Sequence, residues 1–233
     1  LPGCPVCRVS ATAVDRYLDS LIYEKVNDPG LRSALRESRG FCQRHAWGLV
    51  RHGAALGTAI MMRDVLRTLQ RTLAEGRFRN MPLLSLSRVQ ESLDAEQPRA
   101  STAEAVAALG PQAACPACAH EASVESGLLA SFLENLQGDD GLLPVYHKSS
   151  GFCLNHFRQV LSRIGDEEVY TLVVEAQQAI WAKLEGQLSE LIRKSDYRYS
   201  DEELGEEGVS WLRSLMAVAG AGYGSKSHGD GYL

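Results

Sequence analysis

Hydrophobic residues recur at helical spacing over most of the chain. The longest stripe begins after the acidic stretch 166–168 and predicts a helix that continues to about Arg193, because apolar residues three and four positions apart share one helical face. Shorter patterns predict further helices at 11–26, 31–38, 81–93, 102–109, 121–136, 152–164 and 209–219. Strand-like alternation is weak throughout. The expected fold class is therefore all-α.

Glycine and proline divide these patterns. A third helix over 42–51 is expected to bend at Gly53 and Gly57 and to continue to Glu75, while Pro144 is expected to interrupt a short helix. The resulting domain organisation has four parts. We expect a first helical repeat at 1–80, a linker at 81–114, a second repeat with a C-terminal helix at 115–219, and a disordered glycine-rich tail at 220–233.

The chain carries one cysteine motif twice. C-P-x-C at positions 4–7 is followed by G-F-C-x-x-H at 40–45, and the same two motifs stand at 115–118 and 151–156 with the same separation. The copies align without a gap, so that Cys4 matches Cys115 and His45 matches His156, and 14 of the 42 aligned positions are identical. This agreement indicates an internal duplication and predicts two pseudo-symmetric helical repeats.

All 6 cysteines of the chain belong to these motifs. Each copy offers three sulfurs and one imidazole, which is the ligand set of a closed Cys3His metal site. We expect each site to form within its own copy, where the ion would join the C-P-x-C turn to a helix that starts at the C-x-x-H motif. The expected metal ligands are Cys4, Cys7, Cys42 and His45 in the first copy, and Cys115, Cys118, Cys153 and His156 in the second.

Zinc, at two ions per chain, is the expected metal, and two other chemistries stay open. Thiolates also hold iron–sulfur clusters, so each site is also compatible with a cluster that has one histidine ligand. A redox role for the C-P-x-C thiols is the other alternative, although thiol oxidoreductases place this motif in a strand-to-helix context that this sequence lacks. A framework of disulfides would leave an odd cysteine in each repeat.

Bulk composition narrows the class of protein. With 45% hydrophobic and 23% charged residues, the 233-residue chain resembles ordinary globular proteins. A net charge of −5 without a long basic run argues against nucleic acid as a partner. The sequence has no apolar stretch of membrane-spanning length, and we expect no signal peptide. Cysteine-rich metal motifs without a secretory signal favour the cytoplasm.

The remaining residues give little indication of catalysis. Glu-x-x-His pairs, serine nucleophile motifs and glycine-rich phosphate loops are absent from the sequence, so an enzyme is not the expected class. Of the histidines outside the motifs, His52, His147 and His228 are expected at the surface. His120 lies two residues after Cys118 and is the one candidate for an alternative ligand.

The motifs carry a family resemblance. Together with the stretch 194–199 (KSDYRY) and the GEE sequence at 205–207, they resemble an uncharacterised bacterial family of unknown function. The similarity extends from Cys4 to about Trp211. It implies a shared fold and the eight ligands named above, and it implies no activity.

These observations predict a metal-stabilised helical protein that acts as an interaction or scaffold module. Four protein ligands leave no open position for water or substrate, which favours a structural role for zinc. A protein partner or self-association is expected. An electron-transfer subunit with two Cys3His-ligated iron–sulfur clusters and a thiol–zinc redox sensor are the alternatives.

Overall fold

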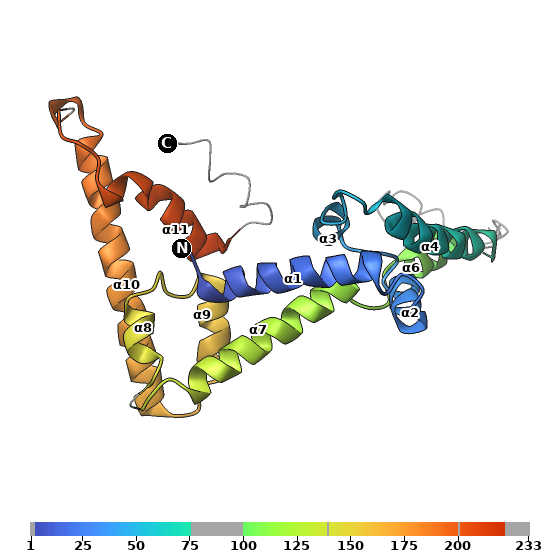
Figure 1. The fold of residues 1–233 in the computed structure, drawn as a ribbon, viewed down its shortest axis with the longest axis horizontal. Helices are drawn as coiled ribbons and strands as arrows, with labels where there is room; N and C mark the ends of the chain where they lie inside the picture. Colours follow the sequence, from blue (N-terminus) through green and yellow to red (C-terminus); the bar gives the residue numbers. More distant parts are fainter. Residues whose placement is uncertain (1–2, 76–99, 139, 200, 222–233) are drawn as a thin grey trace, which may run out of the picture. The chain divides into compact units, whose positions relative to one another are not determined.

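The computed structural model describes residues 3–75, 100–138, 140–199 and 201–221. Within these ranges every regular element is a helix (Figure 1), which confirms the predicted all-α class. None of the described helices is both long enough and apolar enough to cross a membrane. The expected helix at 81–93 and most of the expected tail lie outside the described residues.

The chain divides into two compact units. Unit 1 combines residues 1–14 with 121–233, and unit 2 comprises residues 15–120. This division differs from the expected domain bounds at residues 80 and 114, which follow the order of the two sequence copies. Each unit instead contains part of both copies.

The helices fall into two runs along the chain. The first run consists of α1 (Pro5–Tyr23), α2 (Pro29–Glu37), α3 (Gln43–Trp47), α4 (Ala55–Glu75) and α6 (Ala100–Leu109). The second run consists of α7 (Pro116–Glu134), α8 (Leu143–His147), α9 (Leu154–Leu161), α10 (Glu167–Lys194), two short 3-10 helices η1 (Tyr197–Tyr199) and η2 (Glu206–Val209), and α11 (Ser210–Ala219).

Helices α1 and α7 begin earlier than their apolar periodicity predicted. Each starts at the proline of its C-P-x-C motif, Pro5 or Pro116, and each is 19 residues long. Proline suits the first position of a helix because its fixed φ is helical and its missing N–H needs no partner there. The C-P-x-C motif is therefore the first turn of a long helix, rather than the separate short turn that we expected.

The core of unit 1 forms where α7, α8, α9 and α10 meet (Figure 1). Phe152 lies edge-on to Phe132, with ring centroids 4.8 Å apart, and both rings contact Tyr146. Cys4 and Cys153 belong to the same buried cluster. Pro144 is the second residue of α8, where a proline is compatible with the first helical turn, so it does not interrupt this helix as we expected.

Unit 2 buries the C-terminal part of α1 together with α2 and α4. The carboxylate of Asp28 caps α2 by accepting a hydrogen bond of 2.7 Å from the N–H of Leu31, so α2 begins two residues before the predicted start. The expected continuous helix from 42 to 75 is in fact two helices, α3 and α4, because residues 48–54 form turns. Gly57 allows the start of α4 to approach the carbonyl of Ile22 directly.

Residues after α10 fold back onto its C-terminal end. Lys194 Nζ lies 2.7 Å from Glu207, and Arg193 pairs with Glu190 and Glu202. The guanidinium of Arg193 also lies 4.6 Å from the ring centroid of Tyr199. The KSDYRY stretch (194–199) and the GEE stretch (205–207) therefore contact each other. This contact holds η2 and the start of α11 against the end of α10.

Candidate metal centres

All four cysteine motifs begin a helix in the same way. The carbonyl of the first cysteine in each motif accepts a hydrogen bond from the N–H four residues later, at distances from 2.8 to 3.2 Å. The second ligand of each motif then lies three residues into the sequence, in the first helical turn, on the same side as the first. Helix N-termini favour negative charge, so these positions favour thiolates.

Centre 1 lies in unit 1 and consists of Cys4, Cys7, Cys153 and His156. The first turns of α1 and α9 supply these residues. Nδ1 of His156 is 3.5 Å from Sγ of Cys4, 3.4 Å from Sγ of Cys7 and 3.2 Å from Sγ of Cys153. Sγ of Cys7 is 3.7 Å from Sγ of Cys153. Cys4, Cys153 and His156 are buried, and Cys7 is partly exposed.

Centre 2 lies in unit 2 and consists of Cys42, His45, Cys115 and Cys118. Helices α3 and α7 begin here. Nδ1 of His45 is 3.3 Å from Sγ of both Cys42 and Cys118, and 3.8 Å from Sγ of Cys115. Sγ of Cys42 is 3.5 Å from Sγ of Cys118. His45 and Cys115 are buried, whereas Cys42 and Cys118 are partly exposed.

The structure therefore brings all eight predicted residues into two groups of four, but not the groups that we expected. Each centre combines the C-P-x-C motif of one copy with the G-F-C-x-x-H motif of the other copy. The expectation that each site forms within its own copy is wrong. The four ligand atoms of each centre all lie within 4.8 Å of one another.

Helix length explains the exchanged pairing. A helix of 19 residues extends about 28 Å, so α1 carries the chain far from the C-P-x-C turn at which it starts. Its residues up to 14 belong to unit 1 and those from 15 onward belong to unit 2. The G-F-C-x-x-H motif of the first copy consequently follows in unit 2, where the start of α7 supplies the second C-P-x-C turn.

In both centres the cysteine of the C-x-x-H motif is the favoured thiolate. Hydrogen bonds from Cys4 and Cys7 hold the pKa of Cys153 far below its usual value, despite its burial. Burial opposes ionisation of Cys42, but hydrogen bonds from the His45 backbone and the Cys118 thiol lower its pKa overall. Metal ions bind thiolates, so these two sulfurs are prepared for coordination.

The second cysteine of each C-P-x-C motif has a raised pKa, opposite to the lowered pKa of the C-x-x-H cysteine. Its hydrogen bond to Cys153 raises the pKa of Cys7 strongly, and its burial adds to this effect. Burial together with the hydrogen bond to Cys42 raises the pKa of Cys118 to about 12. These thiols share their protons with the neighbouring thiolates, and a bound cation would replace those protons.

The pKa values of the two histidines shift in opposite directions. Burial and the nearby Arg44 lower the pKa of His45 to about 4, so His45 is neutral at pH 7. Burial also opposes charge on His156, but the sulfurs of Cys153 and Cys4 outweigh it and raise the pKa to about 11. Nδ1 faces the sulfurs in both centres. A neutral imidazole is the form that coordinates a metal.

Sequence reasoning missed two residues beside centre 1. Oε1 of Glu125 on α7 lies 3.1 Å from Nε2 of His156, on the side of the ring that faces away from the sulfurs. Gln177 on α10 is fully buried, and it hydrogen-bonds both the N–H and the carbonyl of Phe152, the residue before Cys153. Neither residue is repeated in the other copy, where Val14 and Leu66 stand at these positions, so the duplication gave no signal.

The other candidates from the sequence lie elsewhere. His120 stacks on the ring of Tyr17, with centroids 4.2 Å apart, and belongs to neither group of ligands. The carbonyl of His52 accepts a hydrogen bond from the hydroxyl of Tyr23, and the side chain of His147 is exposed. His228 lies outside the described residues.

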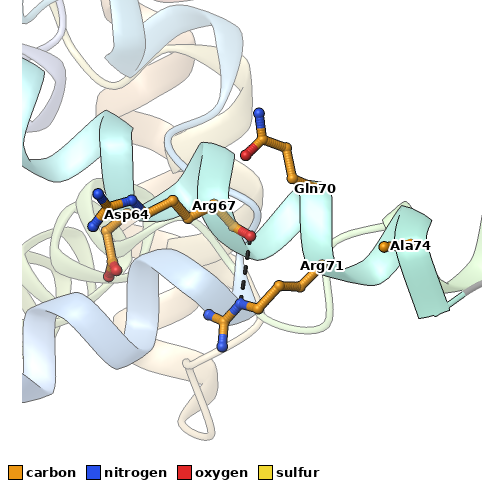
Figure 2. A pocket seen from close by; sticks show the side chains of 5 residues that line it. All are labelled: Asp64, Arg67, Gln70, Arg71 and Ala74. Carbon is orange, nitrogen blue, oxygen red and sulfur yellow. Dashed lines mark hydrogen bonds between the residues drawn. The ribbon is translucent and has the colours of Figure 1, made fainter.

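A surface hollow along α4 does not provide a competing site. Figure 2 shows its five lining residues, which are Asp64, Arg67, Gln70, Arg71 and Ala74. All five belong to this one helix. Asp64 already pairs with Arg32 and Arg36, and Nε of Arg71 donates to the carbonyl of Arg67. These groups do not converge on a shared point, as the polar groups of a ligand site do.

The fold and the two centres define an all-α protein with paired Cys3His sites that could each hold a metal ion. The chain belongs to the family described as "Family of unknown function (DUF6062)", whose model matches residues 2–223. It is also similar to an uncharacterized 23.9 kDa protein in the xynA 3'region of Caldicellulosiruptor sp. (strain Rt8B.4). The two are 23% identical over 222 residues, which cover 93% of this chain and 95% of that protein. No solved structure matches the chain significantly.

Proposed function

We propose that this protein is a zinc-stabilised helical scaffold that carries one structural ion at each centre and has no catalytic role. Each ion would join the start of a long helix to the start of a helix from the other sequence copy. The observation that carries this proposal is the convergence of four ligand atoms within 4.8 Å at both centres. Closed sites with four protein ligands are typical of structural zinc.

The ligand spacing favours a single ion over a cluster. Zinc–sulfur bonds of about 2.3 Å at tetrahedral angles place two sulfurs about 3.8 Å apart. The corresponding Sγ–Sγ distances are 3.7 Å for Cys7 and Cys153 and 3.5 Å for Cys42 and Cys118. An iron–sulfur cluster distributes its ligands over two or more iron atoms and needs a wider cage.

Double variants test both the metal and the exchanged pairing. Cys4→Ser combined with Cys153→Ser removes two ligands of centre 1, so the purified protein should retain about one zinc ion of two. Cys4→Ser combined with Cys42→Ser removes one ligand from each centre, so both ions should be lost or weakened. Elemental analysis after gel filtration measures the metal content, and circular dichroism shows whether each variant is helical.

The outcomes separate the alternatives. If pairing occurred within each copy, the metal contents of the two double variants would be reversed. A colourless wild-type protein with about two zinc ions supports the proposal, whereas a brown protein with iron and sulfide after anaerobic purification would establish the electron-transfer alternative. A wild-type protein that is fully folded without metal would reject a structural role for the ions.

The thiol-sensor alternative has one structural observation in its favour. Cys42 and Cys118 are both partly exposed and lie close together, so peroxide could oxidise them to a disulfide while being reduced to water. Mild peroxide would then release zinc and shift the mobility of the non-reduced protein. Cysteines that stay reduced and zinc-bound under this treatment would exclude the sensor.

A protein partner or self-association is part of the same proposal. Trp211, Leu215 and Val218 of α11 are all more than half exposed and recur at helical spacing, which is typical of a contact face. We expect neither nucleic acid nor membranes as partners, and we expect the reduced cysteines to belong to a cytoplasmic protein. Analytical ultracentrifugation of the wild type and of Leu215→Glu would test self-association. A dimeric wild type that becomes monomeric in Leu215→Glu supports it. A monomeric wild type would exclude self-association, and the partner would then be a different protein.

A further inference from the structure

Helix α11 has little buried surface of its own. Ser210 is the one residue of this helix that is buried, whereas Trp211, Leu215 and Val218 are all more than half exposed. Helices in proteins are stabilised mostly by the packing of an apolar face, so α11 gains little stability from this source. The position of α11 therefore depends on the contacts at its two ends, and both ends lie within unit 1.

The N-terminal end of α11 is attached to α10. Helix η2 directly precedes α11, and Glu207 of η2 pairs with Lys194 at the end of α10, at 2.7 Å. The guanidinium of Arg213, in the first turn of α11, donates a hydrogen bond to the carbonyl of Glu206. These contacts include no candidate metal ligand, so they do not depend on a bound ion.

The C-terminal end of α11 reaches centre 1. Gly220 follows the helix with a φ of 82°, and a Cβ added there would lie 3.4 Å from Sγ of Cys7 and 3.6 Å from Sγ of Cys153. The backbone N–H of Ala221 hydrogen-bonds the sulfur of Cys7. Helix α11 accordingly runs from the end of α10 toward the first turn of α1 (Figure 1). The main chain of Gly220 and Ala221 thus lies against two of the ligand sulfurs.

A second contact lies one turn earlier in α11. Sδ of Met216 would lie 3.2 Å from a Cβ added at Gly3, the residue before Cys4. Helix α11 also contacts α9, which begins after Cys153 and carries His156. Helix α11 therefore touches both segments that supply the ligands of centre 1.

A bound ion would strengthen this attachment. Cysteines coordinate metals as thiolates, and a hydrogen bond to an ionised acceptor is about twice as strong as one between neutral groups. The ion would also hold Cys7 and Cys153 in one tetrahedral arrangement, so the two sulfurs that contact the end of α11 could not move apart. Groups that hydrogen-bond the ligands in turn influence the affinity for the metal.

We propose that the ion at centre 1 latches the C-terminal end of α11, so that occupancy of this centre fixes the exposed apolar face formed by Trp211, Leu215 and Val218. The inference rests on the proposed metal-binding function and adds a regulatory role to centre 1. When the ion leaves, α11 stays attached to α10 through η2, but its C-terminal end is released. Because coupling between two sites is reciprocal, attachment of α11 also raises the affinity of centre 1 for its ion.

Hydrogen exchange of the full chain tests the latch. With zinc at both centres, the amides of α11 should be protected. Cys153→Ser vacates centre 1 and should speed the exchange of α11 roughly 10-fold. Cys42→Ser vacates centre 2 instead and is the matched control, in which α11 should exchange as in the wild type. Exchange of α11 that is equal in Cys153→Ser and the wild type, or equally fast in both variants, would overturn the proposal.

Gly220→Ala tests the latch with all eight candidate ligands in place. It decides the question if Cys153→Ser unfolds unit 1, which peptides from the buried part of α10 around Ala176 would reveal. The added methyl group should displace the end of α11 from the sulfurs and speed the exchange of α11. In the Cys42→Ser background, which leaves one ion at centre 1, Gly220→Ala should also weaken zinc binding roughly 10-fold in competition with a chelator.

Zinc affinity separates a latch from a merely structural glycine. A role confined to ending the helix would speed the exchange of α11 and leave the zinc affinity unchanged, which would overturn the proposal. Gly138→Ala is the matched control, because Gly138 also has a positive φ, 108°, but an added Cβ there meets nothing within 4 Å. Equal effects of the two alanine variants would also contradict the latch. A wild type that binds no zinc overturns the proposed function as well, whereas two bound ions with an α11 that is insensitive to centre 1 overturn only this inference.

Discussion

Helices α8 and α10 in unit 1 and helices α2 and α4 in unit 2 stand at corresponding positions of the two sequence copies, and each pair is joined in a different way. In unit 1, the hydroxyl of Tyr146 on α8 donates to the side-chain oxygen of Gln177 on α10, and both residues are buried. In unit 2, α2 and α4 bury Leu35 where α8 has Tyr146, and an ion pair of Arg32 with Asp64 joins them at the surface. Corresponding positions thus form a buried polar link in unit 1 and an apolar contact with a surface ion pair in unit 2.

The loops that precede the two C-x-x-H motifs also have different neighbours in the two units. Gly151 lies against the amide of Gln177, which also holds the backbone of Phe152. Gly40 lies instead against the side chains of Met62 and Val65. The side-chain amide of a neighbouring helix thus holds the loop of centre 1, whereas the loop of centre 2 packs on apolar side chains of α4 and is hydrogen-bonded locally, by the Ser38 hydroxyl to the Gly40 carbonyl. The candidate ligands recur in both sequence copies, but Gln177 does not, because Leu66 stands at the corresponding position.

The largest effects should come from the buried leucines at corresponding positions of α1 and α7. Leu18 in unit 2 and Leu129 in unit 1 are both fully buried. Replacing either by alanine should lower the free energy of unfolding by about 2–5 kcal/mol, because the removed methyl groups leave a cavity. Urea denaturation measures the loss, and hydrogen exchange locates it. Increased exchange in unit 1 for Leu129→Ala and in unit 2 for Leu18→Ala would confirm separate cores, and identical exchange maps would contradict them.

Gln177→Leu should have the next largest effect. Leucine stands at the corresponding position in the first copy, as Leu66, where it is 55% exposed. In unit 1 the change removes the acceptor of the Tyr146 hydroxyl and the donor to the Phe152 carbonyl, so we expect a loss of about 1–3 kcal/mol. The reciprocal change Leu66→Gln should alter stability by less than about 0.5 kcal/mol. Equal losses for the two variants, measured by thermal denaturation, would show that the buried link has no special role.

Much of this organisation could be predicted from the sequence, and the failures have a physical cause. The eight candidate ligands, which the structure gathers into two groups, and the long α10 follow from spacing and periodicity. The pairing of the ligands did not follow, because both copies have the same motifs at the same separation and either pairing satisfies the chemistry. The deciding fact was that Pro5 begins α1, so the helix includes the C-P-x-C turn and is 19 residues long. The contacts of Glu125 and Gln177 depend on tertiary packing, which no local pattern encodes.

Removing a helix cap in either unit should lower the free energy of unfolding by a smaller amount. Asp28 caps α2, and Asp166 caps α10 with a 3.0 Å hydrogen bond from the N–H of Val169. We expect Asp28→Ala to cost about 1 kcal/mol and Asp166→Ala about 0.5 kcal/mol, since the contact of Asp166 is exposed to solvent. Asparagine at either position retains a capping oxygen and should stay close to wild type in urea denaturation. Alanine and asparagine variants of equal stability would exclude the caps as a source of stability.

The ion pair that joins α2 to α4 should have the smallest effect. Asp64 is about one-fifth exposed and accepts hydrogen bonds from Arg32 at 3.1 Å and from Arg36 at 2.8 Å, and these contacts lower the pKa of its carboxyl group. Because such pairs are screened by solvent, Asp64→Asn should cost only about 0.5 kcal/mol at low salt, and the difference from wild type should shrink in 1 M sodium chloride. The buried Tyr146–Gln177 link, tested by Gln177→Leu in the same buffers, should show little dependence on salt. If the cost of Asp64→Asn did not depend on salt, or equalled that of Gln177→Leu, the contrast between a surface ion pair in unit 2 and a buried polar link in unit 1 would fail.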